Sequence, residues 1–139
     1  MSNQILPKEE NKLTCCSLSI IVKGGVAELE YPQSMRQVLN ASYCIIDSVT
    51  SLNNFKEIYY IYCNVSFFRS RDSSFGYNLL QTFQSQENGP FFFPTRQFNY
   101  LNVTPNKIQF YLKKRSGDTF ELDTSYEGII NLSLFGYEI

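Results

Sequence analysis

Residues 107–123 read KIQFYLKKRSGDTFELD, and this stretch decides the fold. Its first half alternates apolar and polar side chains, so Ile108, Phe110 and Leu112 share one face of a β-strand. Ser, Gly and Asp follow at 116–118, and these residues favour the backbone conformations of a turn. The stretch therefore predicts an antiparallel hairpin with one apolar face.

The return strand of this hairpin covers residues 119–123. By the same alternation we expect Phe120 and Leu122 to point into the core, and Glu121 and Asp123 to point to solvent. Two carboxylates on a wet face are typical of a solvated surface. We therefore assign them neither a metal site nor a glycosidase-type pair.

Further strands follow from the same pattern. Leu18–Lys23 and Val26–Tyr31 flank Gly24-Gly25, which predicts a two-residue β-hairpin because both turn positions need a positive φ. The last strand is expected from Gly128 to Leu134, with three alternating apolar positions on one face: Ile130, Leu132 and Leu134.

The run Glu57–Phe68 is the strongest strand in the chain, since β-branched and aromatic residues dominate it. We assign its more apolar face to the core and Ile58, Tyr60 and Tyr62 to the other side. The core face holds Tyr59, Ile61, Cys63, Val65 and Phe67.

Three weaker segments complete the pattern. Met35–Leu39 and Tyr43–Val49 are expected as short strands. Phe75–Phe83 is compatible with a helical turn, and any helix in the chain is expected between Ser73 and Gln84.

The predicted fold is all-β: a two-sheet antiparallel sandwich, jelly-roll-like, with about eight strands. The absence of Trp removes the Cys…Trp…Cys pattern of immunoglobulin domains. Residues 1–14 are expected to form a flexible polar arm and 15–139 a single domain. The predicted core is Ile20, Val22, Leu29, Ile61, Val65, Ile108, Phe110, Leu112, Phe120, Leu122, Ile130, Leu132 and Leu134.

Composition excludes several kinds of chemistry. The chain has 139 residues, a net charge of −1 and no His. Without His, no Ser-His-Asp or Cys-His arrangement and no His metal ligand can form. No phosphate-binding loop and no nucleophile elbow occurs in the sequence. We therefore expect a protein that is not an enzyme and that has no cofactor and no metal site.

The four cysteines are Cys15, Cys16, Cys44 and Cys63. They form no C-x-x-C pair, and the first residues do not resemble a secretory signal. We therefore expect thiols and an intracellular location, cytoplasmic or nuclear. No apolar run is long enough for a membrane-spanning helix.

Basic residues lie beside aromatic ones at two places. Arg69, Arg71 and Arg96 are near phenylalanines in the sequence, and the run 113–115 (Lys-Lys-Arg) follows Tyr111. Such a combination can bind single-stranded nucleic acid. Because the net charge is −1, we expect no nucleic-acid binding. We expect these basic side chains to be solvent-exposed residues at strand ends.

The aromatic content is larger than one small core requires, with 12 Phe and 10 Tyr. Phe91, Phe92 and Phe93 lie between two prolines, which confines them to an edge strand or a loop. Because strand side chains alternate, at least one of the three rings must reach solvent or a partner. We expect these three residues, with Phe98 and Tyr100, to form a protein–protein interface.

Four segments in the C-terminal part carry a family resemblance: NYLNV at 99–103, KIQFYL at 107–112, SGDTFEL at 116–122 and INLSL at 130–134. In this part the chain resembles small jelly-roll minor capsid or penton-type proteins of Polinton/Maverick elements, adintoviruses and related double-stranded DNA viruses. The resemblance implies a structural virion protein that forms homo-oligomers or binds other capsid proteins, without cofactor or active site. It also implies a location in the virion or inside the host cell, whereas a protein that is not viral would be cytoplasmic or nuclear.

One alternative stays open. A β-sandwich with surface tyrosines and asparagines is also compatible with a carbohydrate- or receptor-binding module that has no catalytic activity.

Overall fold

The structure is a computed structural model, and it describes residues 13–30, 39–64, 79–94, 99–100 and 107–138. Within these ranges there is no helix, which confirms the all-β class. Nor does this part of the chain hold a helix that could cross a membrane. The strands are β1 Leu13–Lys23, β2 Val26–Glu30, β3 Leu39–Ser51, β4 Ile58–Cys63, β5 Leu79–Gln84, β6 Phe91–Phe92, β7 Asn99–Tyr100, β8 Lys107–Ser116, β9 Thr119–Leu122 and β10 Glu127–Glu138.

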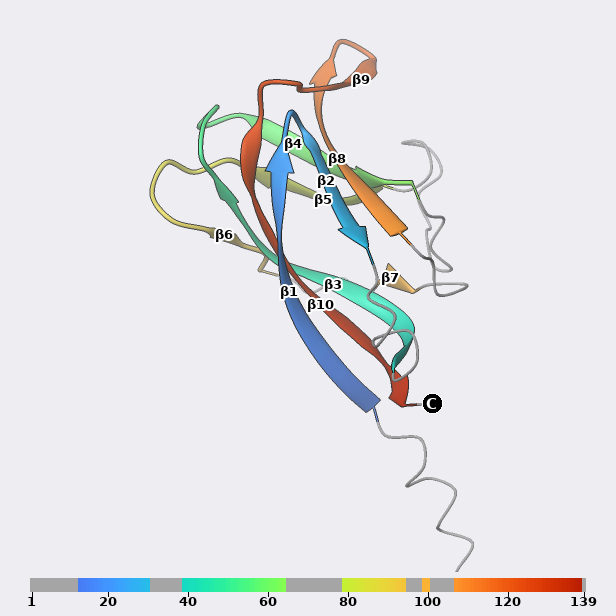
Figure 1. The fold of residues 1–139 in the computed structure, drawn as a ribbon. Coiled ribbons are helices and arrows are strands. Elements are labelled where there is room, and N and C mark those ends of the chain that lie inside the picture. Colours follow the sequence, from blue (N-terminus) through green and yellow to red (C-terminus); the bar gives the residue numbers. More distant parts are fainter. Residues whose placement is uncertain (1–12, 31–38, 65–78, 95–98, 101–106, 139) are drawn as a thin grey trace, which may run out of the picture.

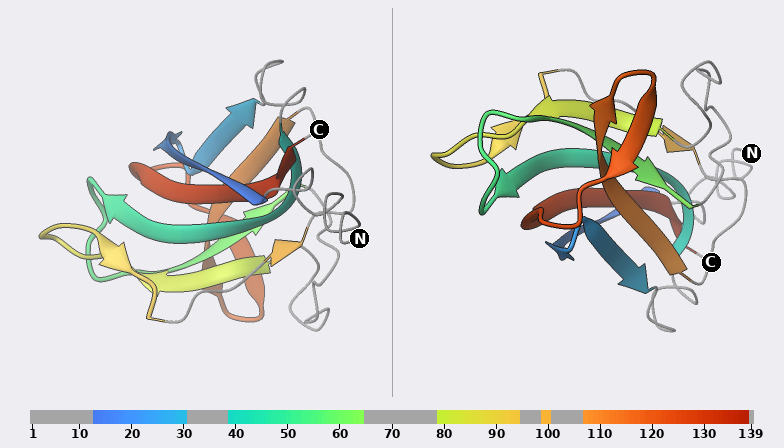
Figure 2. Two further views of the ribbon diagram at one scale, coloured as in Figure 1. Left: turned by 90° about the horizontal axis from the view of Figure 1, so that it is seen from below. Right: turned by 90° about the horizontal axis from the view of Figure 1, so that it is seen from above.

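The strands form one antiparallel sheet that folds over into two layers (Figures 1 and 2). The first layer contains β1, β10 and β3, with the short strands β6 and β7 paired to β3. The second layer contains β2, β8, β4 and β5, with β9 paired to β8. The layers join through the β1–β2 hairpin, in which two residue pairs face each other: Val22 with Ala27 and Lys23 with Val26. The expected sandwich is confirmed, as a nearly closed, barrel-like form of it.

The hairpin between β1 and β2 turns at Gly24 and Gly25, as the sequence predicted. Their φ angles are 63° and 77°, in the left-handed region that favours glycine. Gly25 is also close to the loop after β9. A Cβ placed on Gly25 would lie 2.4 Å from the carbonyl oxygen of Asp123. This position therefore requires glycine for its conformation and for its space.

Ten of the thirteen predicted core residues are buried between the layers. Val65 lies outside the described residues. The other two predictions were wrong: Phe120 is half-buried and Leu122 is 37% exposed, both on the outer face of the second layer. The confirmed core residues are Ile20, Val22, Leu29, Ile61, Ile108, Phe110, Leu112, Ile130, Leu132 and Leu134.

Strand β4 has the predicted sidedness at Tyr59, Ile61 and Cys63, which are buried in the core cluster. Tyr62, which was predicted on the other side, is also buried, at 7% exposure, with the ring of Phe120 against it. The strand ends at Cys63, and Phe67 lies outside the described residues.

The segment that could have been helical is a strand from Leu79 to Gln84, with Leu80 and Phe83 facing the core. Pairing with β4 explains this outcome, because it satisfies the backbone of both strands across Tyr59↔Phe83 and its neighbours.

At the N-terminal end, β1 begins at Leu13, two residues before the expected domain boundary. Leu13 pairs with Tyr137 and Thr14 with Gly136. Residues 1–12 of the expected arm lie outside the described residues, as do 35–38 of a predicted short strand.

Candidate functional site

The carboxylate of Asp123 is buried, with 8% of the residue exposed, and the prediction that it points to solvent was wrong. Its Oδ1 accepts hydrogen bonds from the backbone N–H of Ser125 at 3.1 Å and from the Ser125 hydroxyl at 2.6 Å. Its Oδ2 accepts from the Tyr59 hydroxyl and from Nδ2 of Asn54 at 3.1 Å. Lys114 Nζ lies 3.7 Å from the same oxygen. Both carboxylate oxygens are therefore satisfied.

These contacts shift the pKa values of both partners. Burial alone raises the pKa of the Asp123 carboxyl, but the hydrogen bonds from Ser125 and Tyr59 and the charge of Lys114 outweigh it. The net pKa of Asp123 is lowered. The pKa of Tyr59 is raised, first by burial and then by its hydrogen bond to Asp123. The pair therefore keeps a charged carboxylate and a neutral phenol around neutral pH.

The β3–β4 loop clamps the loop that carries Asp123. Asn53 Nδ2 donates to the Ser125 carbonyl at 2.7 Å, and Asn53 Oδ1 accepts from the Glu127 N–H at 2.8 Å. Asn54 adds a hydrogen bond to the Ser125 hydroxyl at 2.7 Å, from a backbone with φ of 53°. Asparagine tolerates this left-handed conformation better than most residues.

Tyr126 completes the buried cluster beside Asp123. Its ring lies edge-on to Tyr59 with centroids 4.6 Å apart, and its hydroxyl hydrogen-bonds to the Ser51 hydroxyl at 2.7 Å. Burial raises the pKa of Tyr126 to about 12. Gly128 leaves room for this ring, because a Cβ there would lie 2.7 Å from the Tyr126 hydroxyl.

The Asp123 cluster joins the two layers rather than presenting a reactive group. A fully hydrogen-bonded carboxylate inside the protein has no remaining position for a substrate. In the described ranges, no group of three or more Cys, Asp or Glu residues could hold a metal ion.

The predicted aromatic interface is partly described. Phe91 and Phe92 form the edge strand β6 against Val49 and Ser48 of β3, which confirms the expected edge position. Phe91 and Phe93 pack on the core, with ring centroids 6.1 and 6.3 Å from that of buried Phe83. Phe92 points the other way and is 68% exposed. One ring of the three therefore reaches solvent.

The remaining interface candidates are less defined. Phe98 lies outside the described residues, as do Arg69, Arg71 and Arg96. Tyr100 is in β7, where its backbone pairs with Tyr43 of β3, and its side chain is outside the described part.

A second aromatic group, which the sequence analysis did not assign to a site, covers the outer face of the second layer. Phe120 contacts Tyr60 and Tyr62, with centroids 4.8 and 5.9 Å apart. Lys113 Nζ lies 4.6 Å from the centroid of the Tyr62 ring, within cation–π distance. The sequence contained part of the information needed to find this group, because its alternation assigned Tyr60 and Tyr62 to the side of β4 away from the core.

The cysteines are thiols in this structure. Cys15 is exposed and Cys16 is half-buried, whereas Cys44 and Cys63 belong to the core. Burial raises the pKa of Cys44 to about 12, and the nearby Cys63 and Asp47 add to the shift. A buried thiol with so high a pKa acts as a small apolar side chain rather than as a nucleophile.

Comparison with known proteins adds no family: no protein-family model matches the chain, and no curated protein is significantly similar to it.

Proposed function

We propose that this protein is a structural subunit that acts through protein–protein assembly, of the minor capsid or penton type. In this role it needs neither cofactor nor catalytic group. Its partners are further copies of the same chain, other capsid proteins, or both.

One observation carries the proposal: the exposed ring of Phe92 on edge strand β6. Phe91 and Phe93 hold the backbone in place from the inside by packing on Phe83. Phe92, at 68% exposure, is therefore a fixed apolar group at the edge of a sheet. Rigid exposed aromatics are typical centres of protein–protein interfaces, since little conformational entropy is lost when they bind.

The resemblance of residues 99–134 to small jelly-roll capsid proteins supports the same role. So does the polar composition of residues 1–12, which carry Lys8, Glu9, Glu10 and Lys12. Polar arms of this kind commonly order when they bind a neighbouring subunit.

The test is the oligomeric state of the full chain, by native mass spectrometry and sedimentation equilibrium. We expect wild type to form a defined oligomer and Phe92→Ser to shift it to smaller species, with an unchanged thermal midpoint. Ile21→Ser is the matched control, because Ile21 is 73% exposed on β1 in the first layer. A wild type that stays monomeric at all concentrations would contradict assembly with further copies of the same chain. Equal dissociation by both variants would contradict the role of Phe92.

A further inference from the structure

A shallow depression of about 340 Å³ lies at the end of the second layer, where β4 begins and β8 ends. Its size is within the range of small-molecule sites. The lining residues come from the β3–β4 loop, from β4 and from β8: Lys56, Glu57, Ile58, Tyr60, Lys114 and Arg115.

Three of these side chains are cations and one is a carboxylate. Arg115 is exposed, and its Nε donates to the Gly117 carbonyl at 2.9 Å, which leaves both Nη groups to donate to a ligand. Lys114 contacts buried Asp123 at 3.7 Å, and its side chain is still 40% exposed. The depression therefore combines a positive rim with a single carboxylate, Glu57.

Its apolar part is formed by β4. Ile58 is 53% exposed, and the neighbouring outward ring is that of Tyr60. Phe120 holds the Tyr60 ring from one side through an edge contact at 4.8 Å. The apolar surface is therefore pre-formed, and a ligand does not have to order it.

Lys56 is held in place by the backbone of its own loop. It has φ of 66°, a conformation that is costly for a residue with a side chain. Its N–H donates to the Ser85 carbonyl at 2.8 Å, and the Ser85 N–H donates to the Glu57 carbonyl at 2.8 Å. The Ser85 hydroxyl donates to the Asn54 carbonyl at 2.6 Å. These hydrogen bonds compensate for the backbone strain at Lys56 and fix the position of its Cα, from which the side chain extends.

We propose that this depression binds an acidic sugar, a ring that carries a carboxylate or a sulfate ester. The Arg115 guanidinium matches the planar geometry of a carboxylate and can donate two hydrogen bonds at once. Tyr60 and Ile58 offer an apolar surface to the C–H face of the ring, and Glu57 accepts hydrogen bonds from its hydroxyls. A site for an extended polyanion would gain nothing from Glu57, because that carboxylate repels a ligand without hydroxyl donors.

The experiment is an NMR titration of the full chain with sialyllactose, sulfated lactose and lactose. We expect at least one of the two acidic sugars to shift the backbone amide resonances of residues 56–60 and 114–115. Lactose is expected to bind at least about tenfold more weakly, because it lacks the acidic group that makes a charge-assisted hydrogen bond. Equal binding of lactose, or shifts elsewhere in the chain, would overturn the proposal. So would equal or tighter binding of an oligothymidylate, which would instead indicate a polyanion surface.

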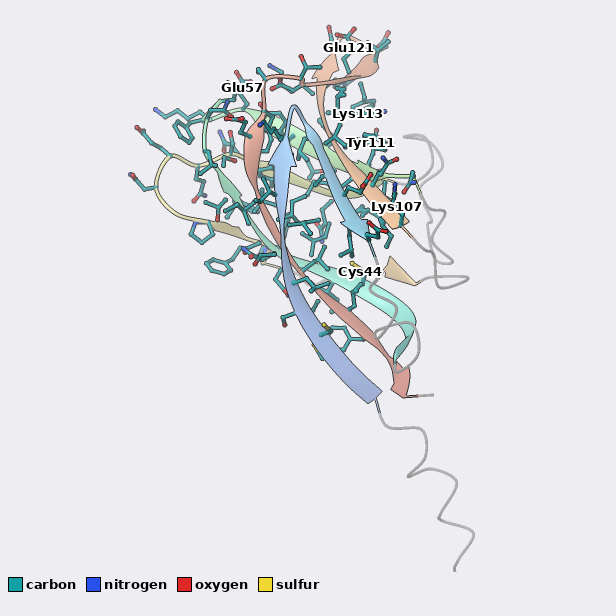
Figure 3. All side chains as sticks on the ribbon, in the orientation of Figure 1. Cys44, Glu57, Lys107, Tyr111, Lys113 and Glu121 are labelled. Atoms are coloured by element: carbon teal, nitrogen blue, oxygen red, sulfur yellow. The ribbon has the colours of Figure 1, made fainter. Side chains whose placement is uncertain are left out.

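Two variants have matched controls on the same sheet. Arg115→Gln is expected to weaken binding of the acidic sugar about tenfold, whereas Lys107→Gln leaves it unchanged. Lys107 lies at the opposite end of β8, paired with Glu28 at 3.5 Å (Figure 3). Tyr60→Leu is expected to weaken binding, and Tyr111→Leu, on the neighbouring strand, is not. If either control weakens binding as much as its partner variant, the site has been misplaced.

Discussion

The hydroxyl of Tyr59 donates a hydrogen bond to Oδ2 of Asp123, 64 positions away along the chain. Tyr59 is fully buried on β4, and Asp123 follows β9 at the end of the second layer. Together with Asn54 and Ser125, this pair links the β3–β4 loop to the connection between β9 and β10. Among the described residues, Asp123 is the buried side chain that carries a charge; the other buried polar side chains are Ser48, Ser51, Ser85 and Ser133.

Removing the Tyr59 hydroxyl is therefore expected to destabilise the protein. Tyr59→Phe leaves a buried carboxylate with one donor fewer, and we expect a loss of about 1.5–3 kcal/mol in the free energy of unfolding. Chemical denaturation measures it. Tyr60→Phe is the control, because this neighbouring ring lies on the outer face, and equal losses in the two variants would contradict the assigned role.

Acid should abolish the contribution of Asp123. Its pKa in the folded state lies below the ordinary value of 3.8, so its stabilising effect is complete above 3.8 and is lost as the pH falls through the folded-state pKa. We expect the difference in unfolding free energy between wild type and Asp123→Asn to shrink over that window. A difference that stays constant as the pH falls would show that the charge is not involved.

Alanine substitutions at Gly25 and Gly117 distinguish the cost of a left-handed backbone from the cost of a steric clash. Both glycines have a left-handed φ, of 77° and 64°, but only Gly25 has an obstacle, the Asp123 carbonyl. Gly117→Ala is expected to cost about 1–2 kcal/mol for the conformation alone. Gly25→Ala should cost clearly more, as measured by thermal and urea unfolding. Equal costs would mean that the hairpin can move away from the loop.

The alternating leucines of β10 give a test of the core. Leu132 is fully buried, and Leu132→Ala is expected to cost about 2–5 kcal/mol through lost burial and a residual cavity. Ile21→Ala, on the exposed side of β1, should change stability by about 0.5 kcal/mol or less. Thermal unfolding distinguishes them, and a silent Leu132→Ala would mean that the inward face of β10 is wrongly assigned.

The thiols should differ in reactivity. A thiol reagent is expected to label Cys15 in the native protein and Cys44 only after unfolding, because burial raises the pKa of Cys44 to about 12. Mass spectrometry of the labelled chain counts the adducts. Dithiothreitol should leave the melting temperature unchanged, and a sharp fall would instead indicate disulfides.

The sequence predicted the alternation in residues 107–112 and 128–134 correctly, but it misplaced the return strand β9. A three-residue turn at 116–118 would have placed Leu122 beside Leu112. The turn contains only Gly117 and Asp118, so Ser116 pairs with Thr119 and the sequence continues with Asp123 opposite Leu112. A shift of one residue moves every side chain of a strand to the other face.

The length of the β8–β9 turn also limits what the sequence could predict of the sites. Periodicity places Tyr60 and Tyr62 on the side of β4 away from the core. Their contact with Phe120, under which Tyr62 is only 7% exposed, depends on the turn length. The Asp123 cluster could not be predicted, because Asn54 and Tyr59 reach it through tertiary contacts that no local pattern encodes. An outward ring among Phe91, Phe92 and Phe93 was predictable, since two prolines confine these residues to an edge strand or a loop and alternation requires at least one outward ring.

The place of β10 in the first layer has a consequence for synthesis. This strand comes after the other described strands in chain order and yet lies between β1 and β3, pairing with both along most of its length. A nascent chain that has not reached Glu127 therefore has β1 and β3 without their shared neighbour. The first layer can close only after translation has passed β10, and until then its edges are open to aggregation and to chaperones.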